Sequence, residues 1–245
     1  MIRNISICLM SFASCVVLNA EIIDTNDAAA VSAFRAGATG VDFESVAGVT
    51  PQAINSYHSG DAISPSAFLF DQVSGVQFSV GGMPGTNSPA LFQLTGAIAG
   101  DAKSPTTVLG PVDFSFLTNF QGGAMMEIFF PEKVSKVGFW LNPSLGDVKL
   151  IAADTNFAFS HLPETNLETL DRAHAGNFVG IERPTADIGG FKIIGLGQAG
   201  FTIDNFTYAG DPGASAVPEP ATSLLMGSVL ASIGLLRRLR RQGRN

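Results

Sequence analysis

Residues 124–143, AMMEIFFPEKVSKVGFWLNP, contain the clearest strand pattern in the sequence. The apolar run 124–130 predicts one strand and the alternating run 134–141 a second, because aromatic and β-branched residues favour extended backbone. The intervening Pro131-Glu132-Lys133 predicts a turn, and Asn142-Pro143 marks the end of the second strand. Two neighbouring strands of this kind indicate a β-rich fold.

Similar short segments occur on both sides of this stretch. They predict further strands at 41–46, 76–80, 91–94, 112–116, 147–154, 157–162, 178–182, 191–196 and 201–208. One short helix is expected over 28–35, where the segment Asp24-Thr25-Asn26-Asp27 can cap its start and Gly37 stops it. About ten short strands, without repeated amphipathic helices between them, predict an all-β fold of the β-sandwich or jelly-roll type.

Charge is distributed unevenly along the chain. Of the 21 acidic residues, 20 lie in 21–216, which contains only 8 of the 14 basic residues. This body therefore carries a formal charge near −12, which removes the electrostatic case for binding nucleic acid and favours solubility. Its length suits one hydrophobic core, so we expect one domain at 21–208 and a flexible linker at 209–216, where Asp211-Pro212-Gly213 lies.

The first twenty residues have the layout of a secretory signal peptide. Arg3 precedes the apolar run 5–18, and Ala20 is a small residue after which we expect cleavage. Both cysteines, Cys8 and Cys15, lie in this leader, so the exported body is expected to fold without disulfides. An alternative interpretation takes Cys15 as the acylated residue of a lipoprotein.

The C-terminal residues 217–245 divide into a turn, an apolar segment and a basic tip. The turn is Val217-Pro218-Glu219-Pro220, and the segment 221–236 that follows has no charged residue. As a helix rising about 1.5 Å per residue it spans roughly 24 Å, short of the roughly 30 Å hydrocarbon core of a bilayer. Arginines after it can snorkel and lengthen the span, and they favour a cytoplasmic C-terminus. These arginines are Arg237, Arg238, Arg240, Arg241 and Arg244.

The order of Pro-Glu-Pro turn, apolar helix 221–236 and arginine-rich tip 237–244 resembles the PEP-CTERM sorting signal of exported proteins of Gram-negative bacteria. The resemblance implies export by the secretion machinery and a temporary anchor in the inner membrane. It also implies that an exosortase-type peptidase cuts near Pro-Glu-Pro and passes the body to the cell surface or extracellular matrix. The signal predicts a destination and no activity.

Two segments near the ends of the body resemble paired segments of jelly-roll carbohydrate-binding modules and related adhesive domains. They are VDFE at 41–44 and FTIDNF at 201–206. The resemblance implies that the first and last strands lie side by side and hold one structural calcium ion. Because calcium takes about six to eight oxygen ligands, Asp42 or Glu44, Asp204 and Asn205 are expected to supply part of the set. The alternative makes them ordinary outward-facing polar residues.

The sequence singles out no catalytic constellation. His58, His161 and His174 lack the close spacing of a zinc site, and no nucleophile elbow or phosphate loop occurs. We therefore expect a non-catalytic exported surface or matrix protein, for which exopolysaccharide binding is one open function. A secreted polysaccharide hydrolase and a cell-envelope adhesin are the alternatives.

Few aromatic side chains are suited to stacking on a sugar. Apart from phenylalanine the body contains only Trp140, Tyr57 and Tyr208. Phe139 and Trp140 are neighbours in an alternating strand, so one of the two should face outward, and we expect Trp140 to face inward.

Overall fold

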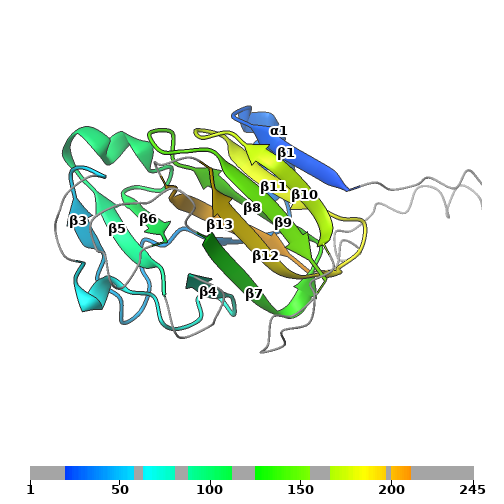
Figure 1. The fold of residues 1–245 in the computed structure, drawn as a ribbon, viewed down its shortest axis with the longest axis horizontal. Coiled ribbons are helices and arrows are strands. Elements are labelled where there is room, and N and C mark those ends of the chain that lie inside the picture. Colours follow the sequence, from blue (N-terminus) through cyan, green and yellow to red (C-terminus); the bar gives the residue numbers. More distant parts are fainter. Residues whose placement is uncertain are drawn as a thin grey trace, which may run out of the picture.

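The computed structural model describes residues 20–57, 63–80, 88–111, 125–154, 166–196 and 200–210. In these ranges two β-sheets pack face to face, with one α-helix and two short 3₁₀ helices beside them (Figure 1). The expected all-β sandwich with one short helix is thereby confirmed. The predicted leader up to residue 19 and the predicted tail 217–245 lie outside the described ranges. Within those ranges no helix has the length and apolar character to cross a bilayer.

The larger sheet has eight strands. In spatial order they are β1 (Glu21–Thr25), β11 (Phe178–Glu182), β8 (Lys136–Leu141), β13 (Ile203–Ala209), β6 (Thr107–Gly110), β5 (Ala90–Leu94) and β3 (Gln52–Ile54), and β2 (Thr39–Val41) also pairs with β13. Strands β3 and β5 are parallel, and the other neighbours are antiparallel.

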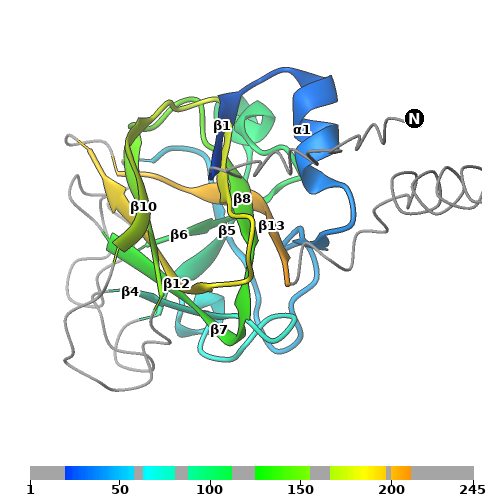
Figure 2. The same cartoon turned by 90° about the vertical axis from the view of Figure 1, so that its right-hand side faces the viewer.

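The smaller sheet has five antiparallel strands. In spatial order they are β10 (Asn166–Ala173), β9 (Val148–Ala153), β12 (Ile188–Gly195), β7 (Met125–Val134) and β4 (Gln77–Val80). The helix α1 (Ala28–Arg35) stands on the outer side of the larger sheet, which Figure 2 shows from the side. The 3₁₀ helices are η1 (Pro65–Ala67) and η2 (Gly96–Asp101).

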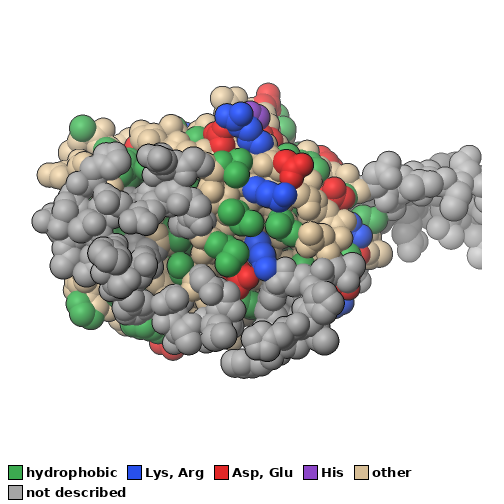
Figure 3. All heavy atoms as spheres, in the orientation of Figure 1, with side chains coloured by type: hydrophobic (Ala, Val, Ile, Leu, Met, Phe, Trp, Pro, Cys, Tyr) green, Lys and Arg blue, Asp and Glu red, His purple; other side chains and the backbone are tan. Residues whose placement is uncertain are grey.

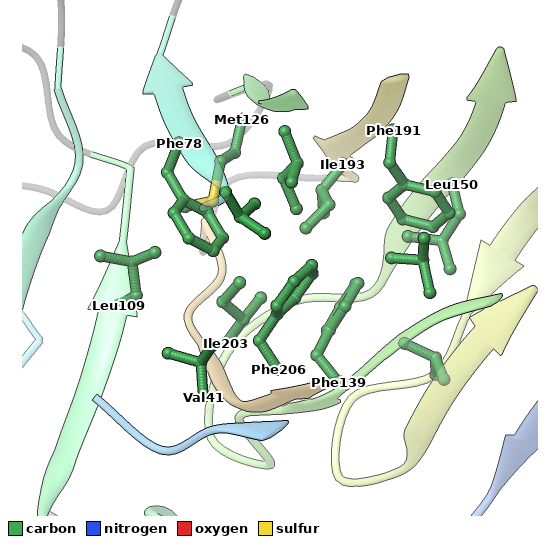
Figure 4. Packing of buried hydrophobic residues seen from close by; sticks show 14 of the residues in the cluster. Val41, Phe78, Leu109, Met126, Phe139, Leu150, Phe191, Ile193, Ile203 and Phe206 are labelled. Carbon is green, nitrogen blue, oxygen red and sulfur yellow. The ribbon is translucent and has the colours of Figure 1, made fainter. Parts of the chain in front are cut away.

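Fully buried side chains from the facing sides of the two sheets fill the space between them (Figure 4). Phe139, Ile203 and Phe206 come from the larger sheet, and Phe78, Met126, Phe191 and Ile193 from the smaller one. Burial of each such side chain contributes about 1.5–3 kcal/mol. This layer is therefore the main apolar source of stability, in keeping with the phenylalanine-rich composition.

The segment 124–143 crosses from one sheet to the other instead of turning at Pro131. Strand β7 continues through Pro131-Glu132-Lys133 to Val134, where the sequence predicts a turn. A register shift between Gly190 and Ile188 of β12 accommodates this stretch, in which proline has no N–H to donate. After Ser135 the chain enters β8, so the two strands face each other across the core.

Further differences concern strands at the borders of the sheets. The expected strand 41–46 is wrong beyond Val41, because Phe43 adopts a positive φ of 63°. The edge strand β10 carries the polar sequence NLETLDRA and was not predicted, since an edge strand needs no continuous apolar face. The strands predicted at 112–116 and 157–162 lie outside the described ranges.

The expected inward position of Trp140 is also wrong. Phe139 is fully buried between the sheets, whereas Trp140 lies on the outer face of the larger sheet and is partly exposed. Here α1 covers the outer face, and Trp140 packs against the small apolar cluster below the helix. Both faces of β8 are therefore apolar, so alternation alone does not decide between the two aromatic residues.

Candidate functional site

Two paired glycines allow α1 to lie close to the larger sheet. Gly138 of β8 and Gly180 of β11 are cross-strand partners. A methyl group on Gly138 would lie 2.8 Å from the ring of Phe34 in α1, and one on Gly180 would lie 2.6 Å from the carbonyl oxygen of Val137. Real Cβ atoms essentially never come closer than 3.0 Å to such neighbours. Any larger residue at these positions would displace the helix or the strand.

The helix is fixed at both ends. The Asp27 side chain accepts hydrogen bonds from the backbone N–H groups of Ala29 and Ala30 at 2.8 and 2.9 Å, so Asp27 is the N-cap within the predicted capping segment. Near the other end, Lys136 Nζ donates to the carbonyl oxygen of Phe34 at 2.8 Å and pairs with Glu182 Oε2 at 3.0 Å. These contacts fix the position of α1 on the larger sheet.

An open groove of about 590 Å³ lies between α1 and Trp140. Its lining residues are Asn26, Ala28, Val31, Ser32, Arg35, Ala36 and Trp140. Trp140 is the only tryptophan in the chain, and its ring meets Phe178 edge to face at a centroid distance of 5.6 Å. The groove thus combines an anchored indole with amide, hydroxyl and guanidinium groups.

Lys103 lies beside the same indole. Its Nζ is 5.1 Å from the centroid of the Trp140 ring, within the range of about 6 Å for a cation–π contact. The backbone N–H of Lys103 donates to Asp204 Oδ2 at 2.6 Å, and Asp204 is the cross-strand partner of Trp140. Strands β8 and β13 therefore position both the ring and the lysine.

Two of the predicted site carboxylates, Glu44 and Asp204, hold the segment 103–107 between them. Asp204 Oδ2 also accepts the backbone N–H of Ser104 at 2.6 Å. Glu44 Oε1 accepts the Ser104 hydroxyl at 2.8 Å and the backbone N–H groups of Thr106 and Thr107 at 2.8 and 2.6 Å. We call this arrangement of Glu44, Asp204 and the donors of residues 103–107 the carboxylate clamp.

The other two predicted site residues make local contacts. Asp42 Oδ1 accepts the backbone N–H of Glu44 at 3.1 Å. Asn205 has a positive φ of 49°, and its backbone N–H donates to Asp204 Oδ1 at 2.6 Å. The expected meeting of the first and last segments is thus observed, since β2 pairs with β13.

The carboxylate clamp fits a hydrogen-bonding role better than calcium coordination. The oxygens of Glu44 and Asp204 accept hydrogen bonds mainly from backbone N–H groups, which have no lone pair with which to ligate a cation. In the described part of the chain no group of three or more His, Cys, Asp or Glu side chains is arranged to hold a metal ion. Calcium binding at Asp42, Glu44, Asp204 and Asn205 stays a prediction.

The environment moves the pKa values of the two clamp carboxyls in opposite directions. Burial raises the pKa of Glu44, but hydrogen bonds from the backbone of Thr106 and Thr107 and from nearby hydroxyls outweigh it, so the pKa lies below the ordinary 4.5. Burial raises the pKa of Asp204 above its ordinary value, and its hydrogen bonds offset only part of this. Asp204 is only 3% exposed, so it cannot reach a substrate.

Of the other side chains that the sequence singled out, His174, Tyr57 and Tyr208 have structural partners. His174 Nδ1 lies 2.6 Å from Asp24 Oδ2, which links the turn before β11 to β1. His58 and His161 lie outside the described ranges. Tyr57 is buried and donates to Asp101 Oδ2 at 2.9 Å, and the Tyr208 hydroxyl donates to the carbonyl oxygen of Ser74. Trp140, by contrast, lines the groove beside α1.

Sequence reasoning missed the polar residues around Trp140. Ser32 lies on the predicted helix and Asn26 lies just before its N-cap, but nothing in the sequence shows which strand the helix covers. Arg35 and Lys103 are far apart in the chain, and only the folding of α1 and of the segment that contains Lys103 onto the larger sheet brings both to the neighbourhood of Trp140. The scarcity of basic residues in an acidic body is the one sequence signal that could have drawn attention to them.

Comparison with known proteins bears on the tail. The family model described as the PEP-CTERM protein-sorting motif matches residues 216–241. The chain carries a PEP-CTERM sorting motif. The match includes Val217-Pro218-Glu219-Pro220, the apolar segment 221–236 and the arginines 237–241, as the sequence indicated. These residues lie outside the described ranges.

No curated protein matches the chain. Among solved structures, this chain is similar to TmCBM61, solved in complex with β-1,4-galactotriose at 1.4 Å resolution. The two share 15% identity, and the alignment covers 56% of this chain and 90% of TmCBM61 with a TM-score of 0.32. At this TM-score the similarity says nothing about what the body binds.

The carboxylate clamp predicts a pH-dependent loss of stability on removal of one charge. We expect Glu44→Gln to lower the free energy of unfolding by about 1–3 kcal/mol near neutral pH. The amide has only one oxygen that can accept the hydrogen bonds now made to the two carboxylate oxygens, and it carries no charge. The folded-state pKa of Glu44 is lowered, so the stabilisation by its ionised form is complete above its ordinary value and is lost as pH falls through the folded value.

Denaturant unfolding from about pH 7 down to about pH 3 measures this effect. The difference between wild type and Glu44→Gln should shrink on acidification. Glu132→Gln is the matched control, because Glu132 is exposed on β7. An unchanged difference between wild type and Glu44→Gln at all pH values would contradict the assigned role of Glu44.

Proposed function

We propose that this chain is an exported, non-catalytic surface or matrix protein whose β-sandwich binds a polysaccharide in the groove between α1 and Trp140. The sorting motif supports the first part. The apolar segment 221–236 holds the precursor in the inner membrane with the arginines in the cytoplasm. An exosortase-type peptidase cuts near Pro218-Glu219-Pro220 and frees the body for the cell surface or extracellular matrix.

The position of Trp140 carries the binding part of the proposal. Small-ligand sites are concave, largely apolar and contain a few placed polar groups. The indole offers a flat apolar surface on which the C–H face of a sugar ring can pack. Asn26, Ser32 and Arg35 line the same groove and can form hydrogen bonds with sugar hydroxyls.

The carboxylates support binding without hydrolysis. A glycosidase needs two carboxyl groups flanking the scissile bond, about 5 to 10 Å apart. The lining formed by the described residues contains neither aspartate nor glutamate. Asp204 has a raised pKa, but it is buried and its oxygens are occupied within the carboxylate clamp. The pKa of Asp147 is lowered by the backbone N–H of Ala175 and by Arg172, which does not suit a general acid. These observations favour the non-catalytic proposal over a secreted polysaccharide hydrolase.

The binding proposal predicts that Trp140 is required for retention by polysaccharide. The full chain in detergent is run through native gels containing galactan, dextran or polygalacturonate, and the products are checked for released sugars. Trp140→Ala should weaken the retarding interaction about tenfold or more, as expected for a central aromatic anchor. Trp140→Phe should keep part of the affinity.

Phe70→Ala is the matched control, because Phe70 is 50% exposed and does not line the groove. Melting followed by circular dichroism shows whether each variant is folded. Equal retardation of a folded Trp140→Ala variant and wild type would contradict binding in the groove. Release of sugars by the wild-type chain would contradict the non-catalytic proposal.

The sorting proposal is tested separately in the bacterial membrane. Replacement of Pro218-Glu219-Pro220 by three alanines should leave the precursor in the membrane fraction, because the junction recognised by the peptidase is gone. Pro212→Ala, in the predicted linker, is the matched control and should be processed normally. Immunoblots of membrane and medium fractions read the outcome, and normal release of the triple variant would rule out cutting at this junction.

A further inference from the structure

Most basic side chains of the sandwich are neutralised by a carboxylate. Of the eight in the body, five form ion pairs. These pairs are Lys136–Glu182, Lys149–Asp171, Arg172–Asp147, Arg183–Asp187 and Lys192–Glu127. On the outer face of the smaller sheet, blue and red side chains accordingly lie next to each other (Figure 3).

Three basic side chains have no ion pair in the part of the chain that the structure describes. They are Arg35, Lys103 and Lys133. Arg35 lines the groove with Trp140, and Lys103 Nζ lies over the Trp140 ring. In a body with 20 acidic and 8 basic residues, one cation without a carboxylate partner thus lines the groove with Trp140 and a second lies over the Trp140 ring.

Among the residues that the structure describes, no carboxylate in the groove competes for these cations, because the described lining contains no acidic residue. Asp204 lies under Lys103, but it is buried and its oxygens accept backbone N–H groups. Asp27 is engaged in capping α1. An anionic ligand can therefore reach Arg35 and Lys103 without breaking an existing ion pair.

We propose that the groove takes an acidic polysaccharide, in which carboxylates of uronic acid units pair with Arg35 and Lys103 while a sugar ring packs on Trp140. This inference rests on the proposed polysaccharide binding. A guanidinium offers paired N–H donors that match a carboxylate, and an ammonium adds a point charge. Elsewhere the acidic surface repels a polyanion, so the groove is the place where such a polymer can dock.

The test compares polygalacturonate with the same polymer after full methyl esterification, which removes the carboxylate charge and keeps the backbone. The full chain in detergent is run in gels containing either polymer. Wild type should bind polygalacturonate more tightly. Arg35→Gln and Lys103→Gln should each lose about three- to tenfold in affinity for polygalacturonate, the range expected for one charge-assisted contact. Neither should change its affinity for the ester.

Lys133→Gln is the matched control, because Lys133 is the third cation without an ion pair and lies on β7, away from the groove. Arg35→Lys should restore part of what Arg35→Gln loses. Equal binding of the two polymers, abolished in both cases by Trp140→Ala, would overturn the acidic preference and leave the proposed function intact. Absence of Trp140-dependent binding to either polymer would overturn both. A loss in Lys133→Gln equal to that in Lys103→Gln would also overturn the assignment.

Discussion

The groove depends on a buried carboxylate at the centre of the larger sheet. Asp204 belongs to the last strand, faces outward beside Trp140, and accepts the backbone N–H groups of Lys103 and Ser104 at 2.6 Å. Because an unpaired buried carboxylate is costly, these donors must stay in place, and the segment that carries Lys103 cannot move away from the indole. Glu44 holds the following residues, so the carboxylate clamp supports one side of the groove and the glycine pair under α1 supports the other.

The fold class could be predicted because most inner strands carry a two-residue apolar period. Phe139, Phe191 and Phe206 follow this period and meet in the core. The crossing between sheets after β7 could not be predicted, because strand patterns do not show which sheet a strand joins. The inward position predicted for Trp140 was wrong because α1 covers the outer face of β8, so both faces of this strand carry apolar side chains. Edge strand β10 could not be predicted, because most of its side chains are exposed or partly exposed and its sequence therefore lacks an apolar period.

The candidate site was only partly within reach of the sequence. The pairing of the first and last segments was predicted and is observed. Glu44 and Asp204 accept hydrogen bonds from backbone and hydroxyl donors there, and calcium binding at these residues stays a prediction. Arg35 lines the same groove as Trp140, and Lys103 lies over the Trp140 ring. This arrangement arises from tertiary packing between segments far apart in the chain. By contrast, the sorting motif is a linear signal, which is why residues 216–241 could be identified from their order alone.

We propose separate functions for the two parts of the chain: the tail directs export of the body, and the groove at Trp140 binds an acidic polymer. Trp140 is the only tryptophan of the chain, so its fluorescence reports on this groove alone. The most direct measurement is the tryptophan emission of the full chain during titration with polygalacturonate. If the polymer binds at Trp140, the emission should change in a saturable way, over the same polymer concentrations at which gels show binding. Binding of the polymer with unchanged emission would contradict binding at Trp140.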